Sequence, residues 1–237
     1  MIETITFDLW NTLFQDKSYS KSRIDYITEF LKKKSKNLDR NFVKNCYDFI
    51  FQYYEVEEIN EIYPHIYTID RIEKLENCLK IKLSENEKNE ILIEIENAML
   101  EDPPSLKIGV RQTLEELNQK YKIGLISNTG ITPGKVIKQV LEKYDILKYF
   151  KITIFSDEVG YYKPTKKLFH KVLNYLESKP EKSIHVGDLL NTDIKGAKKC
   201  GMLSIWLNDI NQERIPNLIP DFEIKKIKDI IDIVRKL

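Results

Sequence analysis

The second half of the chain alternates between short apolar segments and amphipathic segments, and this alternation limits the possible folds more than any other feature. Beyond Pro103-Pro104, the apolar segments predict strands, and the segments whose apolar residues recur every three or four positions predict helices. Strands that alternate with helices form a parallel sheet covered on both faces. We predict strands over residues 122–127, 151–156, 183–187 and 203–207, and helices over residues 109–120, 132–144, 164–177, 193–200 and 226–236.

A further strand is predicted close to the N-terminus, over residues 2–10, and a helical block separates it from the alternating half. Between about Ser18 and Leu100, apolar residues such as Ile24 and Ile27 repeat at helical spacing. Ser84 and Glu87 have the spacing of a capping box. After a first helix around Ile24 and Ile27, we predict helices over about 41–58, 68–79 and 84–100, with no strand in the block.

These patterns predict an α/β fold with two domains. The core, residues 1–14 and 101–237, is expected to be a Rossmann-like, doubly wound and mainly parallel sheet with helices on both faces. Residues 15–100 are expected to form an all-helical insert after the first strand, hereafter the insert.

Composition narrows the class of partner. The 38 basic and 37 acidic side chains give a net charge of +1, so the chain lacks the basic excess typical of nucleic-acid-binding proteins, and no nucleic-acid partner is expected. It has no run of about 18 apolar residues and no signal-peptide pattern, so no membrane association is expected and the cytoplasm is the predicted compartment. Cys46, Cys78 and Cys200 are widely spaced and odd in number, so neither a zinc site nor a disulfide framework is expected.

Polar residues gather just beyond the predicted strand ends. In a parallel sheet, ligands bind at the carboxyl ends of the strands, where the strand order reverses. Taken alone, each of these residues is typical of a turn, a helix cap or a solvated loop. Their weight comes from occurring together in one order beside separately predicted strands: Asp8, Ser127-Asn128-Thr129, Lys163, Asp188 and Asp193.

The order of these residues resembles the four motifs of the haloacid dehalogenase-like superfamily. The motifs read Asp8-x-x-x-Thr12, Ser127-Asn128-Thr129, Lys163-Pro164 and Gly187-Asp188-x-x-x-x-Asp193. The resemblance covers residues 2–13 and about 106–208, and the insert lies where the cap domain of that superfamily lies. It implies a hydrolase, and within the superfamily a phosphatase of small phosphate monoesters.

The resemblance also implies roles for individual residues. Asp8 would be the nucleophile that forms an aspartyl-phosphate intermediate. Lys163 would neutralise negative charge, while Thr12, Ser127 and Asn128 would help to bind the substrate. The implied cofactor is Mg²⁺, with Asp8, Asp188 and the backbone carbonyl of Trp10 as ligands and Asp193 acting through water or its neighbours.

One position departs from the phosphatase pattern. Phosphatases of the superfamily carry a second Asp, the general acid and base, two residues after the nucleophile, and Trp10 stands there in this chain. An indole has no proton acidic enough for this role. A metal-independent 2-haloacid dehalogenase and a binding protein that has lost turnover therefore stay open as alternatives, although the Gly187-Asp188 pair resembles the metal-binding branch. The sequence leaves open whether the chain is a monomer or a homodimer.

Overall fold

The computed structural model describes residues 1–52 and 62–237. Within them, a six-stranded parallel sheet runs in the order β4-β3-β1-β6-β7-β8. The strands are β1 (Thr4–Phe7), β3 (Lys122–Ser127), β4 (Ile152–Phe155), β6 (Ser183–Gly187), β7 (Leu203–Leu207) and β8 (Phe222–Ile224). Because β1 lies between β3 and β6, the strand order reverses at β1, and Asp8 is the first residue after its carboxyl end.

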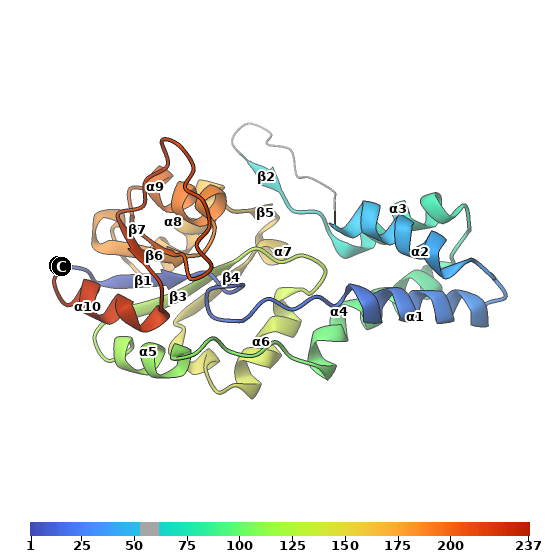
Figure 1. Cartoon of the computed structure of the whole chain (residues 1–237), viewed down its shortest axis with the longest axis horizontal. Coiled ribbons are helices and arrows are strands. Elements are labelled where there is room, and N and C mark those ends of the chain that lie inside the picture. The colour runs from blue at the N-terminus through green and yellow to red at the C-terminus, as the bar shows by residue number, and fades with distance from the viewer. Residues whose placement is uncertain (53–61) are drawn as a thin grey trace.

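Helices cover both faces of this sheet, as the alternating pattern predicts. In Figure 1, α8 (Lys166–Tyr175) and α9 (Lys195–Lys199) lie above the strands, and α5 (Val110–Leu117), α6 (Gly134–Lys143) and α10 (Ile230–Val234) lie below them. All residues of β1 and β6 are buried, including the polar residues Thr4, Thr6, Ser183 and His185 that alternate with their apolar ones. The short helix α7 (Ser156–Val159) and the turns η2 (Leu147–Tyr149), η3 (Pro180–Lys182) and η5 (Ile227–Asp229) complete the connections, together with the π-helix η4 (Leu190–Ile194). The predicted α/β class is confirmed.

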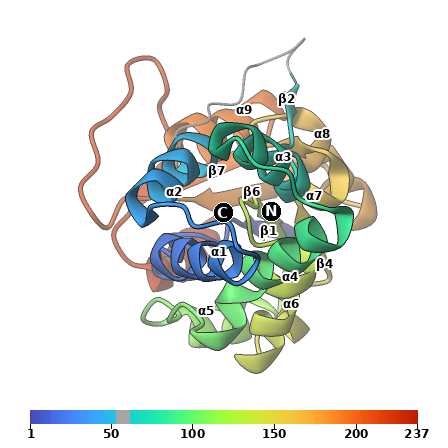
Figure 2. The same cartoon turned by 90° about the vertical axis from the view of Figure 1, so that its right-hand side faces the viewer.

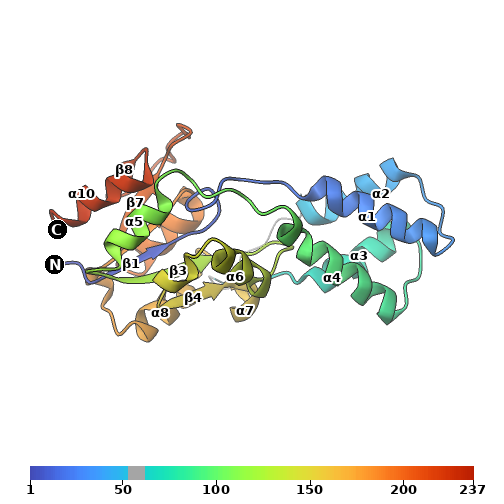
Figure 3. The same ribbon diagram turned by 90° about the horizontal axis from the view of Figure 1, so that it is seen from below.

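The insert forms a second layer of helices with its own apolar interior. It contains α1 (Ser20–Lys33), α2 (Arg40–Tyr47), α3 (Thr68–Leu79) and α4 (Glu85–Glu101). Ile24, Ile27, Ile72 and Ile91 belong to one buried cluster that is separate from the clusters against the sheet. Figure 2 views the molecule from the insert, with these helices in front of the sheet, and Figure 3 shows both termini at the opposite end of the core. The domain boundaries 1–14 with 101–237 and 15–100 stay a prediction.

Helix boundaries within the insert follow the sequence closely, with one exception. The capping box of Ser84 and Glu87 is present, and α3 spans the predicted residues. The second helix, predicted to reach Glu58, ends at Tyr47 and continues as the π-helix η1 (Asp48–Gln52). The remainder of that prediction falls outside the described residues.

Two expectations about the insert are wrong. It is not all-helical, because β2 (Tyr63–Pro64) pairs in antiparallel register with β5 (Tyr161–Tyr162) of the core. We call these residues the β2–β5 strap; each strand is too short to produce a readable alternation. Cys46 and Cys78 form a disulfide between α2 and α3, with Cα atoms 5.9 Å apart, and only the packing of these two helices brings them together.

None of the helices in residues 1–52 and 62–237 is both long and apolar enough to span a bilayer.

Candidate active site

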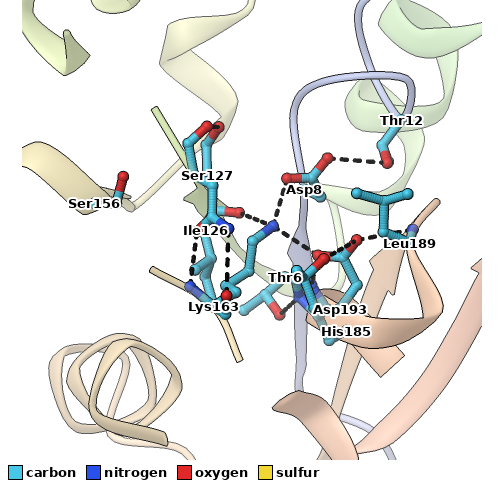
Figure 4. A network of polar contacts seen from close by, with 12 residues as sticks. Thr6, Asp8, Thr12, Ile126, Ser127, Ser156, Lys163, His185, Leu189 and Asp193 are labelled. Carbon is cyan, nitrogen blue, oxygen red and sulfur yellow. Dashed lines mark hydrogen bonds and ion pairs between the residues drawn. The ribbon is translucent and has the colours of Figure 1, made fainter. Parts of the chain in front are cut away.

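Lys163 is the centre of a buried polar network at the carboxyl edge of the sheet (Figure 4). Its Nζ donates hydrogen bonds to Asp8 Oδ1 at 2.5 Å, to Asp193 Oδ1 at 2.6 Å and to the carbonyl of Ile126 at 3.0 Å. Only 1% of the lysine side chain is exposed, so both ion pairs are shielded from water. In such surroundings, the loss of one partner leaves a buried charge without compensation.

The loop that carries Lys163 is fastened to the neighbouring strand end. The backbone N–H of Lys163 donates to Asn128 Oδ1 at 2.7 Å, and Asn128 Nδ2 donates to the carbonyl of Lys163 at 3.4 Å. The peptide bond between Lys163 and Pro164 is cis. The helix predicted over residues 164–177 starts at Lys166, so Pro164 precedes it. Asn128 positions the lysine backbone.

Asp8 follows β1 directly and is held by the turn after it. The carbonyl of Leu9 accepts hydrogen bonds from the backbone N–H groups of Thr12, Leu13 and Phe14, which folds the chain back over the strand end. This turn brings Thr12 Oγ1 to 3.3 Å from Asp8 Oδ2. The two oxygens of Asp8 are thus occupied by different partners, Lys163 and Thr12.

Asp193 is positioned by groups from β6 and the following π-helix. Its Oδ2 accepts from the backbone N–H of Leu189 at 3.0 Å, and its Oδ1 lies 3.2 Å from His185 Nε2. A Cβ atom on Gly187 would lie 2.3 Å from the Cγ of Asp193, so only glycine leaves room for this carboxylate. His185 is fully buried in β6. Its contact with Asp193 is a feature that the sequence did not reveal.

The carboxylates of the cluster differ in pKa because their buried charges act on one another. Burial, partly offset by the Lys163 charge, raises the pKa of Asp8 to about 6. Burial together with the negative charges of Asp8 and Asp193 raises the pKa of Asp188 to about 8. Burial also raises the pKa of Asp193, but its ion pair with Lys163 outweighs that effect and holds this pKa well below its ordinary value. Likewise, the carboxylates outweigh the effect of burial on Lys163 and raise its pKa.

The residues predicted as metal ligands fit a divalent cation. Asp8, Asp188 and Asp193 are buried, and each offers an oxygen within 4.8 Å of those of the other two. When ionised they carry three negative charges against the one positive charge of Lys163, which leaves a deficit that one divalent ion would balance. Oxygen donors of this type suit Mg²⁺. The pKa of Asp188 is raised partly by the same excess of negative charge, since binding a proton relieves the repulsion among the three carboxylates when no cation is bound.

Two predicted site residues form no hydrogen bond with Asp8, Asp193 or the Lys163 ammonium. Ser127 is buried at the end of β3, and its hydroxyl donates to the carbonyl of Asn128 at 3.3 Å. Trp10 is half-buried and packs edge-on against Phe14, with ring centroids 6.2 Å apart. Trp10 also lines a cavity of about 430 Å³ between core and insert.

A second cavity, of about 700 Å³, opens beside Lys163 and is here called the site cavity. Its volume falls within the range of about 300–1,000 Å³ that is usual for small-molecule sites. The core contributes residues from three segments of the chain, and the insert contributes Phe51, Tyr63 and Arg71. The sequence did not single out Arg71 because a lone arginine on a helix carries no motif. The remaining lining residues are Asn128, Thr129, Gly130, Tyr162, Lys163, Pro164, Asn191, Thr192 and Lys195.

Solved structures with the same architecture include several hydrolases. A 2-haloacid dehalogenase from Pseudomonas syringae superposes with a TM-score of 0.72 at 19% identity, covering 100% of this chain and 99% of the other. A HAD phosphatase from Thermococcus onnurineus gives a TM-score of 0.66 at 21% identity, covering 98% of both chains. At these identities the likeness shows the fold alone.

Relatives with higher sequence identity match over part of the chain. The glyceraldehyde 3-phosphate phosphatase of Methanopyrus kandleri is 33% identical over 132 residues, 53% of this chain and 54% of the relative. The pyrimidine 5'-nucleotidase YjjG of Escherichia coli is 30% identical over 142 residues, 59% and 61% of the two chains. The chain thus spans little more than half the length of these relatives. The family model of the haloacid dehalogenase-like hydrolases matches residues 2–201, and the chain belongs to that family.

Proposed function

We propose that the protein is a Mg²⁺-dependent phosphatase that hydrolyses small phosphate monoesters through an aspartyl-phosphate on Asp8. The observation that carries this proposal is the buried lysine bound to Asp8 within a cluster of three carboxylates. Such a cluster needs added positive charge when it is ionised, and a phosphate ester brings further negative charge to the same place. Family membership and phosphatase-named relatives support the same chemistry.

The reaction would proceed in two displacements. A carboxylate oxygen of Asp8 attacks phosphorus, a new P–O bond forms, and the bond from phosphorus to the ester oxygen breaks, so that the alcohol leaves after its oxygen takes a proton from water. Water then attacks the phosphorus of the aspartyl-phosphate, which restores the Asp8 carboxylate and releases inorganic phosphate. Lys163 would balance negative charge in both steps, and the Thr12 hydroxyl would orient the carboxylate that it contacts.

Substrate oxygens would be bound by groups at the same sheet edge. We assign this role to Lys163, Ser127 and Asn128; the hydroxyl of Ser127 would exchange its contact with the Asn128 carbonyl for the phosphate. Bound Mg²⁺ would be held by Asp8, Asp188 and the Trp10 carbonyl, with Asp193 acting through water, and would supply positive charge to the phosphoryl group. The partner is thus a phosphorylated small molecule.

The competing reaction is metal-independent dehalogenation of a 2-haloacid. Trp10 in place of the acid favours it, since a halide leaving group needs no proton. The three-carboxylate cluster disfavours it, because a reaction without metal has no use for two additional buried acids beside the nucleophile. A binding protein without turnover is the third alternative, and it predicts ligand binding without product.

A single panel of substrates separates these alternatives. The purified chain is assayed with phosphate monoesters and with 2-haloacids, in Mg²⁺ and in chelator, beside Asp8→Asn. We expect phosphate release in Mg²⁺ only, none from Asp8→Asn, and a covalent phosphate on Asp8 in rapidly quenched samples. Equal activity in chelator, or an active Asp8→Asn protein, would rule out the proposed mechanism.

A further inference from the structure

Arg71 of α3 is a buried cation that forms no ion pair with a carboxylate of residues 1–52 or 62–237. Only 6% of the residue is exposed. Its Nη1 donates to the carbonyl of Ile50 at 2.8 Å, and its buried Nε has no hydrogen-bond partner. A buried donor without a partner destabilises the folded state, so native structures seldom retain one without a purpose.

The other arginines show how unusual this is. Arg40, Arg111, Arg214 and Arg235 each form an ion pair with a carboxylate. Arg23 and Arg71 form none with any residue in 1–52 or 62–237, and both belong to the insert. Arg23 is bound by neutral partners, the carbonyl of Ile95 and the hydroxyl of Thr132. Arg71 keeps unused donor capacity.

Arg71 lines the site cavity together with Lys163, which contacts the proposed nucleophile. Lys195 is a third cation on the wall of this cavity, and none of its described lining residues is an Asp or a Glu. One phosphate group at Lys163 would leave the charge of Arg71 unbalanced in a poorly solvated place. A planar guanidinium binds carboxylates and phosphates through paired hydrogen bonds, which suits a second anionic group on the same substrate.

We infer that Arg71 is a specificity-determining residue that binds a second anionic group of the substrate. The preferred substrates are therefore small phosphate esters with an additional carboxylate or phosphate, at the opposite end from the ester that reacts. This inference rests on the proposed function and specifies its substrate class. The ring of Phe51 lies beside the guanidinium, with Arg71 Cζ 6.0 Å from its centroid, and restricts the position that the second group can take.

Two matched substrates test the inference. 3-Phosphoglycerate and glycerol 3-phosphate differ in that a carboxylate of the first is a hydroxymethyl group in the second. We expect the wild type to prefer 3-phosphoglycerate in kcat/KM. Arg71→Gln should lower kcat/KM for 3-phosphoglycerate by about 10–100-fold, the value of a charge-assisted hydrogen bond, and change that for glycerol 3-phosphate by less than about threefold. Arg71→Lys should retain part of the preference.

Controls separate this inference from the proposed reaction. Arg40→Gln removes an exposed insert arginine that pairs with Asp25, and it should change neither substrate. Binding of both compounds to Asp8→Asn and to Asp8→Asn/Arg71→Gln, measured by calorimetry, tests the anion site without turnover. If no phosphate ester is hydrolysed but Arg71→Gln still weakens the binding of 3-phosphoglycerate more than that of glycerol 3-phosphate, the proposed reaction is wrong and the anion site at Arg71 is supported. The inference is wrong if Arg71→Gln lowers kcat/KM by the same factor for both compounds and also weakens their binding to the Asp8→Asn protein by the same factor.

Discussion

Lys163 Nζ lies 2.5 Å from Asp8 Oδ1, and 1% and 6% of the two side chains are exposed. The ion pair joins residues that are far apart in sequence, one at the end of β1 and the other in the loop before α8. Burial alone would favour a protonated Asp8, and the lysine charge works against this effect. The proposed nucleophile must be ionised to attack, so the lysine would prepare the Asp8 carboxylate before substrate arrives.

Replacing this lysine should affect both stability and turnover. Lys163→Met leaves Asp8 and Asp193 without their common cation, and breaking a buried pair in this way costs about 3–5 kcal/mol. Loss of a charge that stabilises the transition state lowers kcat by about 10²–10³-fold. Urea denaturation in chelator and steady-state phosphate release measure the two effects. Lys182→Met, which removes an exposed pair with Glu3, is the control and should cost less than about 1 kcal/mol; similar losses in both variants would contradict the assignment.

The second prediction concerns Trp10, which stands where a general acid is expected. If no general acid acts from this position, alkyl phosphates should react much more slowly than aryl phosphates, because an alkoxide is the poorer leaving group. Trp10→Asp should narrow this gap by about 10²-fold or more, within the range of general acid catalysis, while Trp10→Asn, of the same size but without an acid, should not. The measurement is kcat for alkyl and aryl phosphates in each variant. Equal rates in Trp10→Asp and Trp10→Asn would mean that another group already supplies the proton.

The pKa of Asp188 predicts how stability depends on pH in the absence of metal. That pKa is about 8 in the folded chain against an ordinary value of 3.8. Between these values the folded state keeps a proton that the unfolded chain releases, so stability falls as pH rises from about 4 to about 8. Asp188→Asn removes this term. In chelator at pH 8 its Tm should exceed that of the wild type by about 2–4 °C or more, which corresponds to about 1 kcal/mol in a chain of this size.

Added Mg²⁺ should make the wild type more stable than Asp188→Asn. A bound ion stabilises the folded state according to its concentration relative to Kd, so the wild-type Tm should rise with added Mg²⁺ at pH 8. The Tm of Asp188→Asn should respond much less. If Asp188→Asn is less stable than the wild type in chelator throughout this pH range, the repulsion among the three carboxylates is not what destabilises the metal-free protein.

The disulfide of the insert gives a prediction independent of the active site. Cys46 and Cys78 are 32 positions apart, and a cross-link of this span contributes about 2–4 kcal/mol. Reduction or Cys46→Ser should lower the denaturation midpoint. Thiol titration of the unfolded protein should find one group, Cys200, before reduction and three after it. Three thiols without reductant would show that the pair is not formed in solution.

The core was predictable from sequence because its strands and helices are defined by local patterns. The strands β6, which is fully buried, and β7, which is buried apart from Leu203, occupy the residues that the apolar segments indicate. By contrast, β8 and the β2–β5 strap were missed, since two or three residues carry no period. The disulfide was missed for another reason: whether two cysteines meet depends on how α2 packs on α3.

The candidate site was predictable as a set of residues but not as a network. Placing Asp8, Lys163 and Asp193 at one sheet edge follows from the order of motifs in a parallel sheet. The sharing of one ammonium by two carboxylates, the contact of His185 with Asp193, and the cavity wall formed by Arg71 depend on side-chain positions in three dimensions. No spacing rule reports these contacts.

The β2–β5 strap flanks the loop that carries Lys163. The backbone N–H of His65 donates to the carbonyl of Gly160 at 2.9 Å, and that of Tyr63 donates to Thr165 Oγ1 at 3.0 Å. The insert is thus hydrogen-bonded to residues on both sides of Lys163. Any swing that lifts the insert off the core must either break these bonds or pull the lysine backbone along. In the second case, water would enter the cleft at the same moment as Lys163 moves away from Asp8. Asp8 would then lose its counter-charge whenever it is exposed to solvent, and the proposed nucleophile would be less reactive in the open form.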